Sequence, residues 1–348
     1  MGENPKYDIH SLSKYPFMLE INGILSCIGN TPLVPLEKVF PNAHFKLFGK
    51  IEGLNPGGSV KDRPAIKMVQ AALKEGIIDE NTTIVESSSG NLGIGLSQAC
   101  AYWGLKFVCV TDRRCTETNI KIMKAYGTRV EKVTEPDPET GDLLVARLKR
   151  VQHLLDTIPN SFNCNQYKNK HNPLAHHQTA EEIFAELDYK VDYVFCTTST
   201  CGTLRGFSDY IKKKGLNTKV IAVDAVGSII FGDTPKKRLI PGHGAGIIPP
   251  HYQKGIEDGV VHVSDLDCVV GCHKLVHREG IFAGGSSGAV LAGIDKINAE
   301  IPEGAVCVSI LCDSGVRYLD SVYSEEWIAE HFGEISHLWD TPVESYSV

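Results

Sequence analysis

The residues with the clearest chemical potential lie in one short stretch, residues 55–64 (NPGGSVKDRP). It follows a strand-like run, Phe45–Ile51, and opens a helix-like run, Pro64–Lys74. Its glycines permit a tight turn, and Ser59 has the position of a helix N-cap, which places Lys61 in the first helical turn. The helix dipole disfavours a cation there, whereas a lysine that acts as a neutral nucleophile or forms a Schiff base gains from such a site. A solvated surface lysine is the simpler interpretation of this spacing alone, and two further motifs favour the reactive one.

Small hydroxyl residues and glycines occupy three other positions just before a helix-like run. In residues 87–93 (SSSGNLG), backbone N–H groups and serine hydroxyls predict a carboxylate pocket, and Gly90 allows close approach of a ligand. Residues 199–203 (STCGT) predict a phosphate cradle, and residues 284–289 (GGSSGA) repeat the pattern. Alone, each could be an ordinary capped turn. No Gly-x-Gly-x-x-Gly fingerprint follows a strand, which argues against a nicotinamide oxidoreductase.

Strand-like and helix-like runs alternate along the chain. The predicted strands are Phe45–Ile51, Thr83–Ser87, Lys106–Thr111, Arg129–Val133, Tyr193–Thr197, Val220–Asp224 and Val306–Leu311. The predicted helices are Pro64–Lys74, Asn91–Trp103, Glu117–Tyr126, Leu143–Leu155, Thr179–Leu187, Thr203–Lys214, Val269–Glu279 and Ser287–Glu300. Such alternation predicts an α/β fold with parallel, helix-covered sheets.

Composition and charge exclude several classes of function. The chain is 42% hydrophobic and 22% charged, with a formal net charge of -7 and no basic cluster, so nucleic acid and anionic membranes are poor partners. No apolar run reaches the roughly 20 residues that span a bilayer, and residues 1–16 contain no apolar signal segment. The 11 cysteines are scattered without a Cys-x-x-Cys pair, which indicates reduced thiols in a cytoplasmic protein. The 13 histidines form no His-Glu-x-x-His pattern, so we expect no metal.

A reactive lysine, a carboxylate pocket, a phosphate cradle and a late serine turn, in this order, are the parts that pyridoxal 5′-phosphate (PLP) requires. Over about residues 20–325 the chain resembles the fold-type II PLP enzymes, specifically the cysteine synthase and cystathionine β-synthase group. Residues 55–63 carry this resemblance most specifically, and residues 88–91 resemble the family's Thr-Ser-Gly-Asn loop. Residues 199–203 stand where the family has Gly-Thr-Gly-Gly-Thr, and Ser286 stands where it has the serine that faces the pyridine nitrogen.

The resemblance implies a particular architecture. It implies two helix-covered, mostly parallel sheets like those of tryptophan synthase β, with the active site in the cleft between them. We expect a smaller domain, 56–160, that carries the substrate loop, and a larger domain, 18–55 plus 161–330, that holds the cofactor phosphate. We expect residues 331–348 to be a polar tail. A homodimer is the habit of the family.

The resemblance also implies residue roles. Lys61 would form the internal aldimine and later move the α-proton, and Asn91 would hydrogen-bond the ring hydroxyl. A neutral Ser286 would leave the ring nitrogen unprotonated, which favours β-elimination to an aminoacrylate, and addition of a nucleophile completes a β-replacement. The expected cofactor-binding residues are Lys61, Asn91, Ser199, Thr200, Cys201, Gly202, Thr203 and Ser286. The expected substrate-binding residues are Ser88, Ser89, Gly90, Asn91, Arg147, Gln166, Tyr167 and Ser199.

Departures from the cysteine synthase pattern concern the substrates. Ser199 and Cys201 replace glycines, and Tyr167 replaces a phenylalanine and adds a hydroxyl to the cavity. Arg147 lies in the predicted helix 143–155, and an arginine fork suits a phosphate or a dicarboxylate. A surface arginine is an equally simple interpretation of Arg147, because Arg150 and a lysine lie beside it.

With residues 163–167, 226–233 and 280–286, these departures look most like the siderophore-pathway branch. That branch makes N-(2-amino-2-carboxyethyl)-L-glutamate from O-phospho-L-serine and L-glutamate, on the way to 2,3-diaminopropionate. The alternative is a cysteine synthase that uses O-acetyl-L-serine, or O-phosphoserine, and sulfide. A cystathionine β-synthase fits the sequence less well, because we expect no haem-binding extension before the core and no regulatory domain after it. A threonine or serine deaminase also fits less well, because its lysine motif differs from residues 55–63. A cofactor-binding scaffold without turnover is the alternative from another class, and it would explain Lys61, Asn91 and Ser286 poorly.

Overall fold

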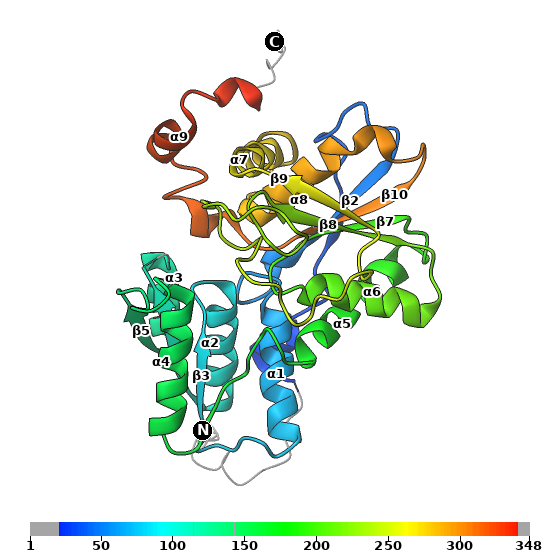
Figure 1. Cartoon of the computed structure of the whole chain (residues 1–348). Helices are drawn as coiled ribbons and strands as arrows, with labels where there is room; N and C mark the ends of the chain where they lie inside the picture. The colour runs from blue at the N-terminus through cyan, green and yellow to red at the C-terminus, as the bar shows by residue number, and fades with distance from the viewer. Residues whose placement is uncertain (1–20, 114, 142, 340–348) are drawn as a thin grey trace, which may run out of the picture.

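A computed structural model of the chain describes residues 21–113, 115–141 and 143–339. Within this part, the strands form a six-stranded and a four-stranded sheet, and Figure 1 shows them in an upper and a lower lobe. The strands of the larger sheet are β1 (Leu33–Pro35), β2 (Lys46–Ile51), β7 (Tyr193–Thr197), β8 (Lys219–Ala225), β9 (Gly259–Val263) and β10 (Val306–Leu311). The strands of the smaller sheet are β3 (Thr83–Ser87), β4 (Lys106–Asp112), β5 (Arg129–Val133) and β6 (Ser161–Phe162).

Helices connect and cover both sheets (Figure 1). They are α1 (Asp62–Lys74), α2 (Asn91–Trp103), α3 (Glu117–Ala125), α4 (Leu143–Thr157), α5 (His171–Glu186), α6 (Gly202–Lys214), α7 (Asp265–Lys274), α8 (Gly285–Lys296) and α9 (Glu325–Phe332). Short 3-10 turns lie at Gly23–Cys27, Glu52–Leu54, Asn298–Glu300, Gly315–Tyr318 and Ser336–Leu338, and a π-helical turn at Leu275–Glu279 continues α7.

The larger sheet has the order β1-β2-β10-β7-β8-β9, and its neighbouring strands are parallel except for β1 and β2. Its central strands are buried on both faces, as parallel strands under helices must be. Phe195 packs with residues of α7 and α8, whereas its neighbours Val194 and Cys196 pack with residues of α5 and α6. The period of two along β7 therefore assigns alternate side chains to two separate cores.

The smaller sheet has the order β5-β4-β3-β6, and its strands are parallel throughout. Ile84 and Phe107 pack with residues of α1, α2 and α3, whereas Val85 and Val108 pack with residues of α4. The predicted fold, two mostly parallel sheets covered by helices, is confirmed.

Most predicted elements are confirmed, and the misses have local causes. Helix α5 begins at His171 rather than Thr179, because Pro173 is tolerated within the first helical turn, where its missing N–H leaves no intrahelical bond unmade. Strands β1 and β6 are too short to show a period, and β9 and α9 were not predicted.

The predicted polar tail, 331–348, is packed where the structure describes it. Helix α9 reaches its first residues, and Ile335 and Trp339 are buried in the core that α7 and α8 build. Trp339 stacks on His273, with ring centroids 4.1 Å apart. Residues 340–348 lie outside the described residues, and the predicted domain limits, 56–160 and 18–55 plus 161–330, stay a prediction.

The functional loops follow the carboxyl ends of parallel strands, the edge at which ligands bind in open α/β sheets. Residues 52–61 follow β2, residues 88–91 follow β3, residues 199–203 follow β7, and residues 312–317 follow β10. Within the described residues, no helix is both long and apolar enough to cross a membrane.

Candidate active site

Lys61 lies where the loop after β2 meets the loop after β10. The N–H of Val60 donates to the carbonyl of Cys312 at 2.7 Å, and Ser59 pairs with Asp313 in an isolated β-bridge. Burial lowers the pKa of Lys61, and the charges of Cys312 and Asp313 oppose that shift. A lysine held in this way has a larger neutral fraction than a surface lysine, which is the form that a nucleophilic amine needs.

The turn before Lys61 requires its glycines. The N–H of Gly57 donates to Oδ2 of Asp62 at 2.5 Å, and a Cβ on Gly57 would lie 2.6 Å from that carboxylate. Gly58 has φ +83°. Ser59 is not the N-cap that the sequence suggested: Lys61 is the N-cap and helix α1 begins at Asp62, and the Ser59 hydroxyl instead accepts the N–H of Lys61 at 3.2 Å.

A buried ion-pair network fixes the start of α1 to the larger sheet. Arg63 Nε lies 2.6 Å from Glu52 Oε2, and Arg63 Nη2 lies 2.7 Å from Glu182 Oε2. Lys50, 1% exposed, lies 2.8 Å from the same Glu182 oxygen. Two cations and two carboxylates thus balance each other in the interior, which makes removal of any one of them costly.

In the predicted substrate loop, the hydroxyl of Ser88 binds backbone N–H groups and the hydroxyl of Ser89 binds Arg147. Ser88 is buried, and its Oγ accepts the N–H of Gly93 at 3.0 Å and that of Gly90 at 3.3 Å. Ser89 Oγ accepts Nη1 of Arg147 at 2.6 Å. A Cβ on Gly90 would meet nothing within 4 Å, so this part of the loop borders open space.

Arg147 reaches the predicted site rather than the surface. It is 9% exposed, and its Nε lies 3.3 Å from Oδ2 of Asp112, which is 0% exposed. Burial raises the pKa of Tyr167, while the charges of Arg147 and Arg238 and a hydrogen bond with Ser199 lower it. The structure therefore brings Arg147, Tyr167 and Ser199 together.

The carboxylate of Glu86 binds backbone N–H groups of two segments, at Ser87 and at Asn165–Gln166. It is buried at the end of β3 and accepts the N–H of Ser87 at 2.8 Å. Burial raises its pKa to about 7, and N–H groups of Ser87, Asn165 and Gln166 oppose that shift. The backbone carbonyl of Gln166 is held by two further contacts. It lies 3.1 Å from Nε2 of His251, and it accepts the side-chain amide of Asn172, on α5, at 2.6 Å.

The predicted phosphate loop is built from backbone and neutral side chains. Cys201 has φ +60°, a left-handed conformation that glycine adopts more easily than other residues. A Cβ on Gly202 would lie 2.3 Å from Oδ1 of Asn172, so the helix N-terminus approaches its neighbour closely. Thr203 Oγ1 lies 3.4 Å from Nε2 of His176, whose pKa burial lowers well below its usual value. Thr200 is buried, and its Oγ1 accepts the N–H of Gly202 at 3.3 Å.

Ser286 lies in the first turn of α8 and is 2% exposed. Its side chain makes a hydrogen bond with the thiol of Cys312, which lies beside Lys61. Gly242, from the long loop between β8 and β9, approaches Ser286 so that a Cβ there would lie 3.9 Å from Ser286 Oγ. Lys61, the turn that contains Ser286 and the long loop between β8 and β9 therefore lie close together.

PLP fits these residues. A lysine with a lowered pKa is available for the aldehyde, the start of α6 is a cradle of N–H and hydroxyl donors, and a neutral hydroxyl from Ser286 lies near that lysine. All eleven cysteines of the sequence lie in the described part of the chain as free thiols. Within that part, no group of three His, Cys, Asp or Glu side chains is placed to hold a metal.

Sequence reasoning missed Asp313, Arg317 and Asp112. Asp313 and Arg317 follow the end of β10, and both contact Asn91. The position of Asp313 just beyond a buried parallel strand was the signal that would have found it. Asp112 ends β4 and had the same signal.

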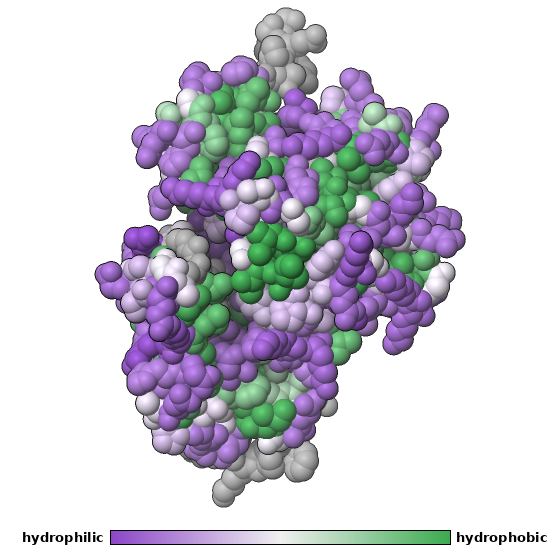
Figure 2. All heavy atoms as spheres, viewed as in Figure 1, coloured by the Kyte–Doolittle hydropathy of each residue, from purple (hydrophilic) through white to green (hydrophobic). Residues whose placement is uncertain are grey.

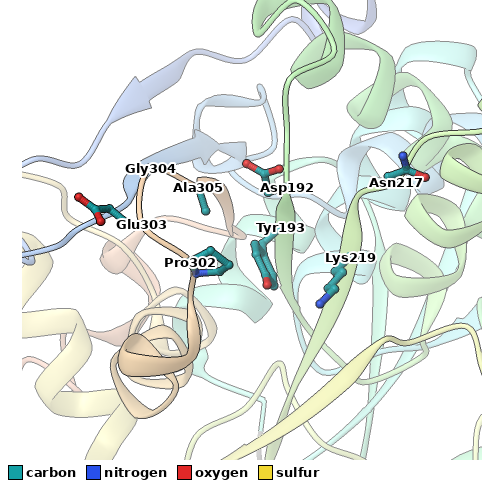
Figure 3. Close-up of a pocket in the computed structure, with 8 residues that line it drawn as sticks. All are labelled: Asp192, Tyr193, Asn217, Lys219, Pro302, Glu303, Gly304 and Ala305. Atoms are coloured by element: carbon teal, nitrogen blue, oxygen red, sulfur yellow. The ribbon is translucent and has the colours of Figure 1, made fainter.

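A pocket of about 380 Å³ lies elsewhere (Figure 3). It is lined by the first residues of β7 and β8, Tyr193 and Lys219, and by the turn before β10, so it opens at the amino ends of the strands. Figure 2 shows the surface indented between the two lobes. The pocket of Figure 3 is therefore not the site that holds Lys61.

Comparisons with known proteins agree with this site. Residues 24–313 match the family model described as pyridoxal-phosphate dependent enzyme. A hydrogen sulfide-producing enzyme from Fusobacterium nucleatum is 35% identical, with a TM-score of 0.79, over 86% of this chain and 99% of its own. An O-acetylserine dependent cystathionine β-synthase from Helicobacter pylori is 31% identical, with a TM-score of 0.81, over 88% of this chain and 100% of its own. An O-ureido-L-serine synthase is 29% identical, with a TM-score of 0.80, over 92% of this chain and 99% of its own.

The chain belongs to the family of pyridoxal-phosphate dependent enzymes, and it is a fold-type II enzyme related to the cysteine synthases.

Proposed function

We propose that this enzyme joins O-phospho-L-serine and L-glutamate to form N-(2-amino-2-carboxyethyl)-L-glutamate, for 2,3-diaminopropionate or siderophore-type biosynthesis. In this β-replacement, the bond between the serine Cβ and its phosphate oxygen breaks and inorganic phosphate leaves. The glutamate amine forms the new bond to Cβ and loses a proton. PLP, when bound, supplies the electron sink that makes the Cα proton and the Cβ leaving group labile.

The observation that carries the phosphate assignment is the burial of Arg147 at the substrate loop. Its guanidinium contacts Ser89 and Asp112, and its charge acts on Tyr167. A guanidinium carries five N–H donors, more than these two contacts use, and it pairs with phosphate in a planar fork. An acetate leaving group has no comparable need for a nearly buried cation.

The remaining residues have complementary roles in this proposal. Lys61 holds and moves the proton at Cα, because its pKa is lowered and it lies beside the cleft. The backbone of Ser88–Asn91 holds the substrate carboxylate, and Gln166 and Tyr167 border the same cavity. Ser199–Thr203 and Ser286 hold the cofactor. From the family habit we also propose a homodimer, which light scattering of the purified protein would test.

A second candidate is a sulfur reaction, with O-acetyl-L-serine or O-phosphoserine as the first substrate and sulfide as the nucleophile. It is favoured by the similarity to the F. nucleatum and H. pylori proteins, one a hydrogen sulfide-producing enzyme and the other dependent on O-acetylserine. The cysteine synthase and the proposed synthase share Lys61, Asn91 and Ser286, so those residues do not separate them.

Product analysis separates the two candidates. The purified holoenzyme is supplied with O-phospho-L-serine or O-acetyl-L-serine, each with L-glutamate or sulfide, and products are identified by mass spectrometry. We expect N-(2-amino-2-carboxyethyl)-L-glutamate from phosphoserine and glutamate, with the highest kcat/KM of the four pairs. Cysteine from acetylserine and sulfide as the preferred product would contradict the proposal.

Arg147→Ala tests whether the buried Arg147 binds the substrate phosphate, and Arg150→Ala is its matched control. Both residues lie on α4, but Arg150 is 36% exposed and pairs with Glu131. We expect Arg147→Ala to raise the KM for phosphoserine by about tenfold to a hundredfold, and far less for acetylserine. Equal effects on the two substrates would reduce Arg147 to a structural residue.

A further inference from the structure

Asp313 is a buried carboxylate of the larger lobe that contacts the substrate loop of the smaller lobe. It is 2% exposed, and its Oδ2 accepts Nδ2 of Asn91 at 2.7 Å and the hydroxyl of Tyr318 at 2.8 Å. Among the described residues, its Oδ1 has no hydrogen-bond partner. The contact with Asn91 joins residues 222 positions apart, one at the start of α2 and one after β10.

Arg317 completes the contact from the other side of the same amide. Its Nη1 donates to Oδ1 of Asn91, and its Nη2 donates to the carbonyl of Gly57. The oxygen of Asn91 therefore faces a cation and its nitrogen faces a carboxylate. A flipped amide would place donor against donor and acceptor against acceptor, so the two charged residues define one orientation.

This arrangement leaves one group of Asn91 for a ligand. The amide nitrogen carries two hydrogens, and Asp313 accepts one of them. The backbone of Asp313 is anchored beside Lys61 by its bridge to Ser59, and near the Ser286 helix because its carbonyl accepts the N–H of Gly284 at 3.1 Å. The Asp313–Asn91 contact therefore lies next to the region shared by Lys61 and Ser286, and among the described residues the Asn91 amide nitrogen donates only to Asp313.

We propose that Asp313 is a positioning residue: it orients the Asn91 amide so that its second N–H is presented to the cofactor hydroxyl, and in doing so ties the substrate loop to the larger lobe. The proposal rests on the assignment of Asn91 to the cofactor, which is part of the proposed function. It does not depend on which leaving group or nucleophile the enzyme uses.

The test uses the cofactor without substrates, so a wrong substrate assignment cannot affect it. Asp313→Ala is compared with Asp320→Ala, whose aspartate lies in the same segment but is exposed. We expect Asp313→Ala to shift the visible absorbance of the bound cofactor and to weaken cofactor binding about tenfold, the effect of one lost hydrogen bond with an unsatisfied partner. Asp320→Ala should match the unmodified protein in both measurements. An unchanged absorbance and affinity in Asp313→Ala, with only a lower Tm, would overturn the proposal.

Two further variants separate orientation from charge and from folding. Asp313→Asn keeps an oxygen acceptor for Asn91 and Tyr318, so we expect it to restore the absorbance and most of the affinity, even if the alanine variant does not fold. An absorbance unlike that of the unmodified protein in Asp313→Asn would contradict an orienting role. In an Asn91→Ala background, Asp313→Ala should weaken cofactor binding no further, because the two residues act through one amide. Additive losses would show that Asp313 acts independently of Asn91.

Discussion

Two loops of this protein have the same local design but different surroundings. Residues 88–91 follow β3 and residues 199–203 follow β7, and each places small hydroxyl residues and a glycine at the start of a helix. The first loop is supported by a charged pair, because Arg147 contacts both Ser89 and Asp112.

The second loop is supported by neutral groups. Asn172 and His176 are buried against it, and burial keeps His176 in its neutral form because its pKa lies well below the usual value. A strand–helix turn supplies N–H donors wherever it occurs. Side chains from other elements decide whether the bound anion also meets a full positive charge.

The largest effect is expected from removing Lys61, the proposed reactive amine. Lys61→Ala should abolish turnover and the visible absorbance of the bound cofactor, because no other described amine occupies its place beside Cys312 and Asp313. The fold should persist, since burial disfavours this ammonium rather than stabilising it. Absorbance and circular dichroism of the purified variant check both parts, and normal turnover would exclude Lys61 as the reactive amine.

A pair of glycine substitutions tests the loops directly. In Gly202→Ala the new Cβ would lie 2.3 Å from Oδ1 of Asn172, so we expect cofactor affinity to fall by more than about tenfold and Tm to fall. In Gly90→Ala the Cβ would meet no protein atom within 4 Å, so Tm and cofactor affinity should stay unchanged.

The KM for the amino-acid substrate should still rise in Gly90→Ala, because the new methyl group would border the proposed substrate pocket. Cofactor titration, calorimetry and steady-state kinetics measure these three quantities. A loss of cofactor affinity in Gly90→Ala as large as in Gly202→Ala would remove the distinction between the two loops.

The ion pair of the first loop gives a test of stability. Arg147→Ala removes one ion-pair partner of the buried Asp112 and should lower the free energy of unfolding by about 3 kcal/mol. Adding Asp112→Asn should recover part of that stability without restoring the KM for phosphoserine. Denaturant unfolding and kinetics of the single and double variants measure the two effects. Recovery of both together would mean that Arg147 acts only on the fold.

Glu86 adds a smaller, pH-dependent difference. Its pKa is raised by burial from 4.5 to about 7, so between these values the folded protein retains a proton that the unfolded chain has lost. The free energy of unfolding should therefore fall as pH rises through this window, by an amount on the order of 1 to 3 kcal/mol from this group.

Glu86→Gln should flatten that slope, although Asp62, with a pKa raised to about 7, should retain part of it. Denaturant unfolding at several pH values from 5 to 8 measures the slope. Glu131→Gln is the control, because Arg150 lowers the pKa of Glu131 and its effect lies at lower pH. Identical slopes in Glu86→Gln and the unmodified protein would contradict the assignment.

Local patterns in the sequence were sufficient for the fold and for Lys61. Buried runs such as Tyr193–Thr197 are apolar over their whole length because helices cover both faces, so strand, helix and parallel sheet could be predicted together. The glycines before Lys61 announce a turn that few other residues adopt. Elements of two or three residues, β6 and β1, were missed because no period develops over so short a run.

The sequence by itself determined the alternation of strands and helices, the parallel pairing of the strands and the order of the loops, because turn geometry and hydrophobic period are local properties. The arrangement in two sheets was implied by the resemblance to fold-type II enzymes, and the reactive role of Lys61 stays a prediction. Only the tertiary structure decided that Arg147 reaches Ser89 and that Asp313 and Arg317 hold Asn91, since these contacts join residues 58, 222 and 226 positions apart. Such contacts depend on how two lobes meet at the carboxyl ends of their strands. Contacts between the two lobes cannot be predicted from the residue pattern of a single segment.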